Sequence, residues 1–161
     1  MNGWRILLLC STFFILGYAG KLEVTADKFT HVDSKKQAVF EGHAHAQEGK
    51  SKIDADKFII YLDKDNEAKE YHAIKNVRFE IIRPSQHIKG RCNYMVYNVK
   101  DDSYKLKGNA KLEDILNKRK MSGSVIYLDN KKQNASVTST KNKPVKFIFQ
   151  MKDKKKRSGK K

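Results

Sequence analysis

Cysteine is scarce in this sequence, which has only Cys10 and Cys92 among its 161 residues. Cys10 lies in an apolar run at the amino terminus, so a chain that lost this run would keep Cys92 alone. Such a chain can form no intramolecular disulfide, although small exported domains often depend on them. Its stability must come from an apolar core, from hydrogen bonds between strands, or from self-association. We expect Cys92 to be a small buried apolar residue and not a reactive thiol.

The common signatures of catalysis are also missing. The sequence has no Gly-x-Ser-x-Gly elbow, no His-Glu-x-x-His and no glycine-rich phosphate loop. Asp54 and Asp56 share a strand face, and paired carboxylates can perform acid–base chemistry. However, Asp27 stands at the matching place of an earlier segment, which favours a structural role at a turn or an edge. We therefore predict that the protein is not an enzyme and uses no cofactor.

One short pattern has the residue types of a metal site. Glu41, His43 and His45 alternate along the chain, so in a strand they would point to one side. Imidazole and carboxylate groups are ligands for zinc or copper. Beyond the His-x-His pair and this nearby carboxylate no further ligand is evident, and we predict no metal site.

The amino terminus has the features of a secretory signal peptide. Ile6–Leu16 is an apolar run that is shorter than a membrane-spanning helix, and Gly17 and Ala19 place small residues before a cleavage point. We predict a signal peptide at residues 1–19, cleavage after Ala19, and export to the periplasm. Retention of this segment as an inner-membrane anchor is the alternative.

Negative charge is in deficit, since the chain carries a formal net charge of +16, of which Arg5 in the signal segment contributes one. Such basicity favours an anionic partner. Export argues against nucleic acid and favours an anionic glycolipid or a membrane surface. Part of the charge lies in residues 151–161, a lysine-rich tail that repels itself and is expected to be disordered.

Residues 20–150 have the period of two that is typical of β-strands. In one segment, Tyr104, Leu106 and Ala110 alternate with lysines 105, 107 and 111. Polar clusters at residues 31–37, 63–67, 100–103 and 129–134 separate such segments and are expected to be hairpin connections. Residues 112–120 are expected to be a strand end followed by a loop. The sequence thus predicts one all-β domain.

The strand segments repeat at intervals of roughly 30–35 residues, which suits a stacked strand–turn–strand unit. Ala26–Phe29 and Ala55–Phe58 both read Ala-Asp-Lys-Phe, and Gly108–Ala110 reads Gly-Asn-Ala. In these motifs the chain resembles the OstA-like family of LptA-like, periplasmic lipopolysaccharide-transport proteins. It departs from the family pattern at Lys75–Val77, where Lys-Asn-Val replaces Gly-Asn-Val.

The resemblance implies a β-jellyroll in which two antiparallel sheets form an open, V-shaped slot for lipopolysaccharide acyl chains. It also implies a protein bridge from an LptC-like inner-membrane protein to an LptD-like outer-membrane protein, with head-to-tail homo-oligomers joined through edge strands. The candidate edge strands are Leu22–Ala26 and Val145–Phe149. Transport of lipopolysaccharide from the inner to the outer membrane is the implied function.

Alternation and the resemblance together predict an inward, lipid-binding face. Its expected members are Leu22, Val24, Ile53, Phe79, Ile81, Met95, Tyr97, Val99, Leu106 and Phe147. An ordinary core filled by its own side chains has the same alternation. Lys105, Lys107 and Lys111 either pair with lipid phosphates or form a solvated strand face.

Two other functions remain open from the sequence. One is a basic periplasmic adaptor that binds anionic polysaccharide and has a filled core. The other is an inner-membrane-anchored, LptC-like paralogue with the same fold.

Overall fold

The computed structural model describes residues 21–140 and 142–151. The predicted signal peptide and nearly all of the predicted tail lie outside the described residues. Ten strands and one short 3-10 turn (Asp33–Lys35) form the described part, which contains no helix long and apolar enough to span a membrane. The strands are β1 (Leu22–Thr25), β2 (Lys28–Val32), β3 (Gln37–Glu48), β4 (Ser51–Leu62), β5 (Ala68–Arg83), β6 (Gln86–Asn98), β7 (Ser103–Asp114), β8 (Arg119–Asp129), β9 (Asn134–Thr138) and β10 (Lys146–Phe149).

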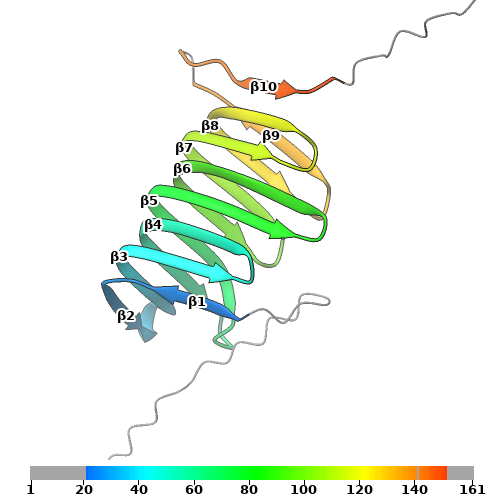
Figure 1. Cartoon of the computed structure of the whole chain (residues 1–161). Coiled ribbons are helices and arrows are strands. Elements are labelled where there is room, and N and C mark those ends of the chain that lie inside the picture. The colour runs from blue at the N-terminus through cyan, green and yellow to red at the C-terminus, as the bar shows by residue number, and fades with distance from the viewer. Residues whose placement is uncertain (1–20, 141, 152–161) are drawn as a thin grey trace, which may run out of the picture.

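All ten strands belong to one antiparallel sheet, in which the order β1-β3-β4-β5-β6-β7-β8-β10 follows the chain (Figure 1). The six long strands β3–β8 are joined by hairpins. The short strands lie in pairs at the two ends of the sheet. At one end, β2 pairs with the first half of β3 and β1 with its second half. At the other end, β10 pairs with the first half of β8 and β9 with its second half.

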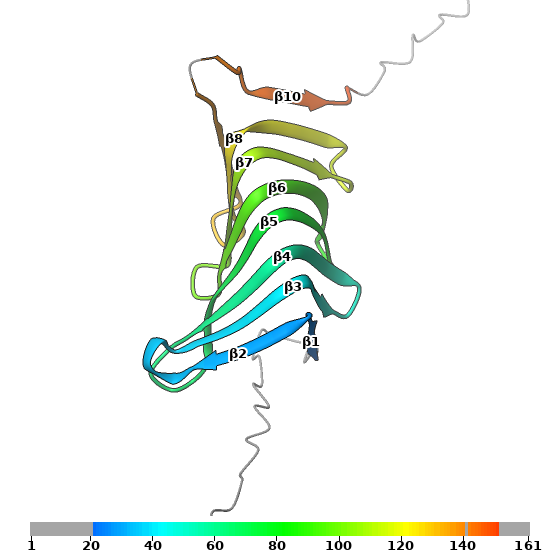
Figure 2. The ribbon, with the colours of Figure 1, turned by 90° about the vertical axis from the view of Figure 1, so that its left-hand side faces the viewer.

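Each long strand bends near its middle, as Figure 2 shows. At the bend, β3, β5 and β7 each carry one residue more than the strands paired with them. Such a bulge kinks a strand and increases its twist. The extra residues have positive φ, and they recur every 33 residues as Gly42-His43, Lys75-Asn76 and Gly108-Asn109.

The bend divides the sheet into two layers. We call layer A the part that holds β1, residues 44–48, 51–55, 77–83, 86–92, 110–114 and 119–123, and β10. Layer B holds β2, residues 37–41, 57–62, 68–74, 94–98, 103–107 and 125–129, and β9. The predicted all-β jellyroll is confirmed. Its two sheets are halves of one continuous sheet, because the strands pass through the bend without ending.

The bend also explains the repeated Ala-Asp-Lys-Phe motif. On β4 the inward residues are three apart across the bend, so Ala55 and Phe58 are both buried although strict alternation would separate them. The intervening Asp56 sits at the bend and accepts both hydrogen bonds donated by the Asn76 amide, at 3.1 and 2.9 Å. The carboxylate therefore holds the bulged residue, which is the structural role expected for this aspartate.

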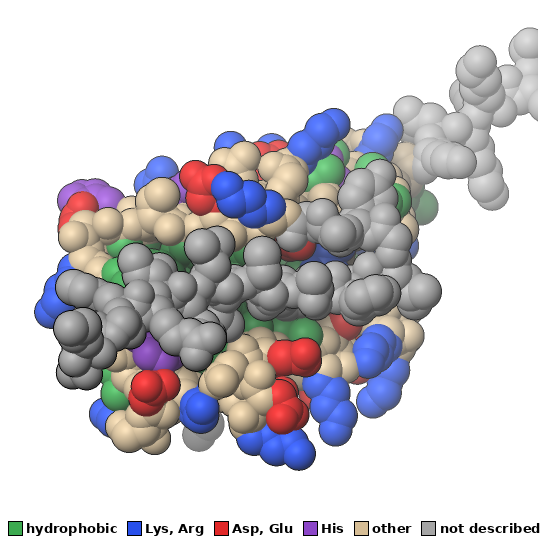
Figure 3. All heavy atoms as spheres, turned by 90° about the horizontal axis from the view of Figure 1, so that it is seen from below, with side chains coloured by type: hydrophobic (Ala, Val, Ile, Leu, Met, Phe, Trp, Pro, Cys, Tyr) green, Lys and Arg blue, Asp and Glu red, His purple; other side chains and the backbone are tan. Residues whose placement is uncertain are grey.

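The predicted loops are confirmed. Each of the four polar clusters connects two strands, and residues 112–120 form the end of β7, a turn and the start of β8. Between the layers lies one apolar core, with Met95, Leu106 and Ile126 almost fully enclosed. Figure 3 looks along the stack from its β1–β2 end and shows hydrophobic side chains lying between the two polar layers.

Candidate functional site

The inward faces of the two layers form the candidate site. Five of the ten predicted lipid-binding residues are buried there: Phe79, Ile81, Met95, Tyr97 and Leu106. Leu22, Val24, Ile53 and Val99 are partly buried and pack against the same core. Sequence alternation therefore placed nine of the ten residues on one continuous interior surface.

Phe147 lies apart from this enclosed core. It stands on β10 opposite Met121, whose side chain is buried, but Phe147 itself is 51% exposed. β10 is the last strand of layer A, so no later strand covers it in the described part of the chain. The interior apolar face thus continues onto an open end of the stack.

A row of aromatic rings crosses the interior side of layer B. Phe58, Tyr71, Tyr97 and Tyr104 lie on β4 to β7, with ring centroids 6.0, 6.1 and 4.6 Å apart in that order. The guanidinium of Arg83 lies over the last two rings, 5.6 Å from Tyr97 and 5.9 Å from Tyr104. This geometry suits a cation–π contact.

Arg83 belongs to layer A, so it joins the two layers at the edge opposite the bend. It donates to the Asp102 carboxylate at 3.1 Å and to the Tyr97 hydroxyl at 3.4 Å. The same carboxylate oxygen accepts hydrogen bonds from Tyr97 at 3.0 Å and from the Asn130 amide at 3.1 Å. Gln86 adds a bond to Asn130 at 2.9 Å. We call these five residues the clasp.

The clasp keeps its charge over a wide pH range. Partial burial alone would favour the neutral form of Asp102, but the bonds from Arg83 and Asn130 outweigh this effect. The pKa of the carboxyl therefore lies below its ordinary value. Burial also raises the pKa of Tyr97, so its hydroxyl remains a donor. The clasp is thus an ion pair reinforced by neutral donors.

Beside the clasp lies a small interior cavity of about 80 Å³. Leu22, Ile53 and Ile81 line it from layer A, and the aromatic row lines it from layer B. Pockets for small molecules usually measure about 300–1,000 Å³. In this form the interior is therefore mostly filled by its own side chains, and a long acyl chain fits only if the layers separate.

The residues considered for a metal site have separate partners. Glu41 pairs with Lys57 at 2.8 Å in layer B, whereas His43 and His45 bond to Asp27 at 2.8 Å and Asp54 at 2.7 Å. The hydrogen bonds to these carboxylates raise the pKa of both histidines. Within the described residues no group of three possible ligands comes together.

Two further predictions concern Cys92 and the lysine row. Cys92 is buried, and burial raises the pKa of its thiol to about 11, so it is the inert apolar residue that was expected. The lysine row does not lie on a single surface. Lys105 and Lys107 lie on layer B and Lys111 on layer A, because the bulge at Gly108 separates them.

The clasp was not predicted from the sequence. Arg83 is the last residue of β5, whereas Asp102 and Asn130 lie in two separate connections that read as ordinary polar turns. Their meeting depends on how the two layers close, for which the sequence offers no local signal.

Comparisons with known proteins are consistent with this geometry. Residues 23–134 match the family model described as the LptA/(LptD N-terminal domain) LPS transport protein. A search of curated proteins found no match. Among solved structures, the fold is similar to LptH, the LptA homologous periplasmic component of the conserved lipopolysaccharide transport device from Pseudomonas aeruginosa. The TM-score is 0.69 at 18% identity, covering 81% of this chain and 96% of LptH.

Proposed function

Because the chain belongs to the family of LptA and the LptD N-terminal domain, the LPS transport proteins, we propose that it carries lipopolysaccharide across the periplasm inside its jellyroll. Members of this family are transport proteins and not enzymes. The observation that carries the proposal is the continuous apolar surface between layers A and B, which is enclosed at the bend and joined at the opposite edge by the polar clasp.

In this proposal the acyl chains lie between the layers, where each square ångström of apolar surface removed from water contributes about 25 cal/mol. The cavity beside Leu22 and Ile53 is the starting point, because these two residues are only partly buried. In this proposal, the cavity becomes larger when the two layers separate at the clasp. The sugar and phosphate groups remain outside, since an apolar interior offers them no hydrogen-bond partners.

The two ends of the stack supply the bridge. β1 and β10 lie at the ends of the strand order, as predicted for Leu22–Ala26 and Val145–Phe149. Phe29 on β2 is 59% exposed, and Phe147 and Phe149 on β10 are 51% and 58% exposed. Unpaired strand edges with exposed apolar side chains are suited to strand addition. We assign these ends to contacts with another copy and with LptC-like and LptD-like partners.

Photo-crosslinking in cells tests the slot. A photoreactive residue at Leu22 or Ile53 is expected to capture lipopolysaccharide, whereas one at Lys107, on the outside of layer B, is expected to capture none. These two positions are better probes than Phe79, which is 5% exposed and tolerates little change. Capture from Lys107 alone would contradict the slot and favour the polysaccharide adaptor.

Two further measurements test location and assembly. N-terminal sequencing of the mature protein is expected to begin after Ala19, and a chain that starts at Met1 would favour the anchored paralogue. Sedimentation at increasing concentration is expected to show growing oligomers. Phe147→Asp is expected to reduce them, and a strict monomer at every concentration would exclude end-to-end assembly.

A further inference from the structure

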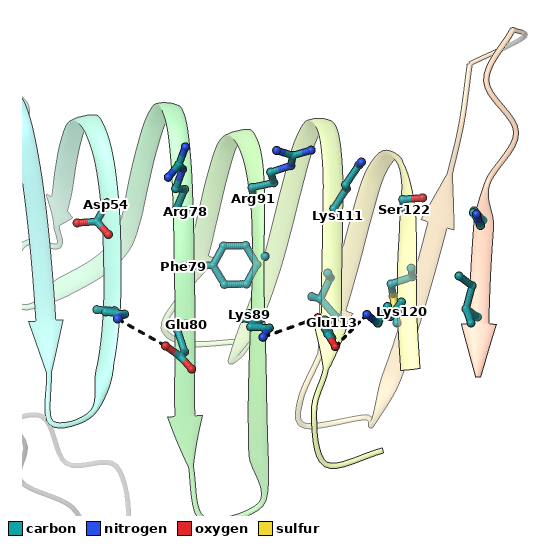
Figure 4. A pocket seen from close by; sticks show the side chains of 16 residues that line it. Asp54, Arg78, Phe79, Glu80, Lys89, Arg91, Lys111, Glu113, Lys120 and Ser122 are labelled. Carbon is teal, nitrogen blue, oxygen red and sulfur yellow. Dashed lines mark ion pairs between the residues drawn. The ribbon is translucent and has the colours of Figure 1, made fainter. Parts of the chain in front are cut away.

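The outer face of layer A is hollowed into an open groove of about 810 Å³, shown in Figure 4. The charged side chains that line it point away from the core, and the buried residues Phe79, Leu112 and Met121 lie beneath them. Two parallel rows of side chains cross it from strand to strand. They are two residues apart along each strand and differ in how their charges are arranged.

The first row, which we call the alternating row, changes sign at each strand. It consists of Lys52, Glu80, Lys89, Glu113 and Lys120, which are direct neighbours in register. Three ion pairs join them, Lys52–Glu80 at 3.6 Å, Lys89–Glu113 at 3.9 Å and Lys120–Glu113 at 3.2 Å. This is the arrangement expected when surface charges serve the fold, since opposite charges facing each other across strands are stabilising.

The second row, which we call the cationic row, consists of Arg78, Arg91, Lys111 and Lys146. Arg78 faces Arg91, Arg91 faces Lys111, and Ser122 separates Lys111 from Lys146. All four cations are exposed, and none forms an ion pair with any carboxylate of the described chain.

The one carboxylate in register with this row is turned away from it. Asp54 faces Arg78 across β4 and β5, yet it bonds to His45 on the other side at 2.7 Å. Figure 4 shows this carboxylate pointing away from Arg78, while the side chains of Arg78, Arg91 and Lys111 point toward the bend. Like charges directly opposite each other destabilise a sheet. The cationic row therefore costs the fold stability, and the neighbouring row shows that the same surface accommodates paired charges.

We propose that this groove binds the phosphorylated sugar portion of lipopolysaccharide through its phosphates, which lie on the cationic row. Adjacent strands are about 4.8 Å apart, so Arg78, Arg91 and Lys111 span about 10 Å. Guanidinium groups bind phosphate oxygens with two hydrogen bonds each. The lysines of the alternating row are already engaged in ion pairs with Glu80 and Glu113. A flat anionic membrane fits a hollowed surface poorly.

The assignment of this ligand rests on the proposed function, but its test does not involve the slot. The probe is oligosaccharide from lipopolysaccharide stripped of all acyl chains, with its phosphates kept, and its binding is measured by calorimetry. The test variant is Arg78→Gln/Arg91→Gln/Lys111→Gln. The matched control is Lys52→Gln/Lys89→Gln/Lys120→Gln, which removes the same three charges from the same face.

We expect the test variant to weaken binding by about tenfold or more and the control by less than about threefold, because charge-assisted bonds to phosphate are lost only from the cationic row. The dephosphorylated oligosaccharide is expected to bind none of the three proteins, wild type included. Equal weakening by both variants would reduce the effect to net charge and overturn the proposal. Equal binding of the dephosphorylated sugar would overturn it too, as would anionic phospholipid vesicles that bind the wild type in preference to the oligosaccharide.

Failure here would leave crosslinking from Leu22 and Ile53 unchanged, so the slot and the groove are tested separately. All positions in both variants are exposed or half-buried, and far-UV circular dichroism checks that the sheet is intact. Single substitution Arg91→Gln, at the centre of the row, provides a milder variant in which a smaller loss of affinity in the same direction is expected.

Discussion

The clasp at the open edge provides the sharpest test of how the two layers are held. Asp102→Asn keeps a similar shape and an acceptor oxygen but removes the negative charge opposite Arg83. Asp102 has φ of 46°, a conformation that asparagine tolerates well, so the backbone should not be disturbed. The substitution therefore isolates the charge.

The size of the effect follows from the bonds that Asp102 accepts. One carboxylate oxygen receives three, from Arg83, Tyr97 and Asn130. Bonds to a charged group contribute about 1.5–3 kcal/mol and neutral ones about 0.5–1.5 kcal/mol. The side chains of Arg83 and Asp102 are each 29% exposed, so solvent weakens the ion pair. We expect the free energy of unfolding to fall by about 1–2 kcal/mol.

Urea denaturation followed by circular dichroism measures this change. Asp101→Asn is the control, because Asp101 is exposed in the same turn and its carboxylate forms no ion pair within the described chain. A spectroscopic label pair across the edge should also report wider separation of the layers in Asp102→Asn. If both variants are as stable as the wild type, within about 0.3 kcal/mol, the clasp does not hold the layers together.

The pH dependence gives a second check on the same bond. The folded-state pKa of Asp102 is below its ordinary value, so its contribution is present above that value and is lost as pH falls through the folded pKa. The stability difference between wild type and Asp102→Asn should be constant from about pH 5 to 8 and shrink below about pH 4. A difference that grows in acid would contradict the assignment.

Three further predictions concern the core, the bend and the thiol. Leu106→Ala should lower the free energy of unfolding by about 2–5 kcal/mol, and the same change at exposed Leu116 by less than about 0.5 kcal/mol, both measured in urea. Lys75→Gly should raise the free energy of unfolding by about 0.5–1 kcal/mol, because φ is 62° there. Gly108→Lys should lower it, because the added Cβ would lie 2.8 Å from Asn93. Thermal melts measure both changes, and a lower melting temperature for Lys75→Gly or a higher one for Gly108→Lys would refute this. Cys92 should react with a thiol reagent only as the protein unfolds, and fast labelling of the folded protein would contradict its burial.

Much of the fold could be predicted from alternation and turn composition. Residues such as Leu106 and Phe79 alternate with charged neighbours, and this pattern alone assigns them to the interior. The loops at residues 63–67 and 129–134 were equally clear, because their polar residues can bury no apolar surface. Lys75-Asn76, which departs from the family pattern, still adopts the positive φ of the other two bends. The bulge therefore depends on register more than on glycine.

Other features depend on contacts between distant residues. The sequence does not show that the two sheets are one, because the bulges that bend it appear only when the register of paired strands is compared. Nor does it separate Phe147, at an uncovered end, from Phe79 in the core, since both follow the same alternation. Whether an inward residue is enclosed depends on which strand, if any, lies opposite.

By itself, the sequence determined an all-β chain with an apolar and a charged side to each strand, because side-chain direction alternates with every residue. Only the tertiary structure decided that Arg83 reaches Asp102 across the open edge. It also decided that Arg78, Arg91 and Lys111 form no ion pair within the described residues, while Lys52 and Lys120 do. Charge partners are set by strand register and layer closure, and both are relations between segments far apart in the chain.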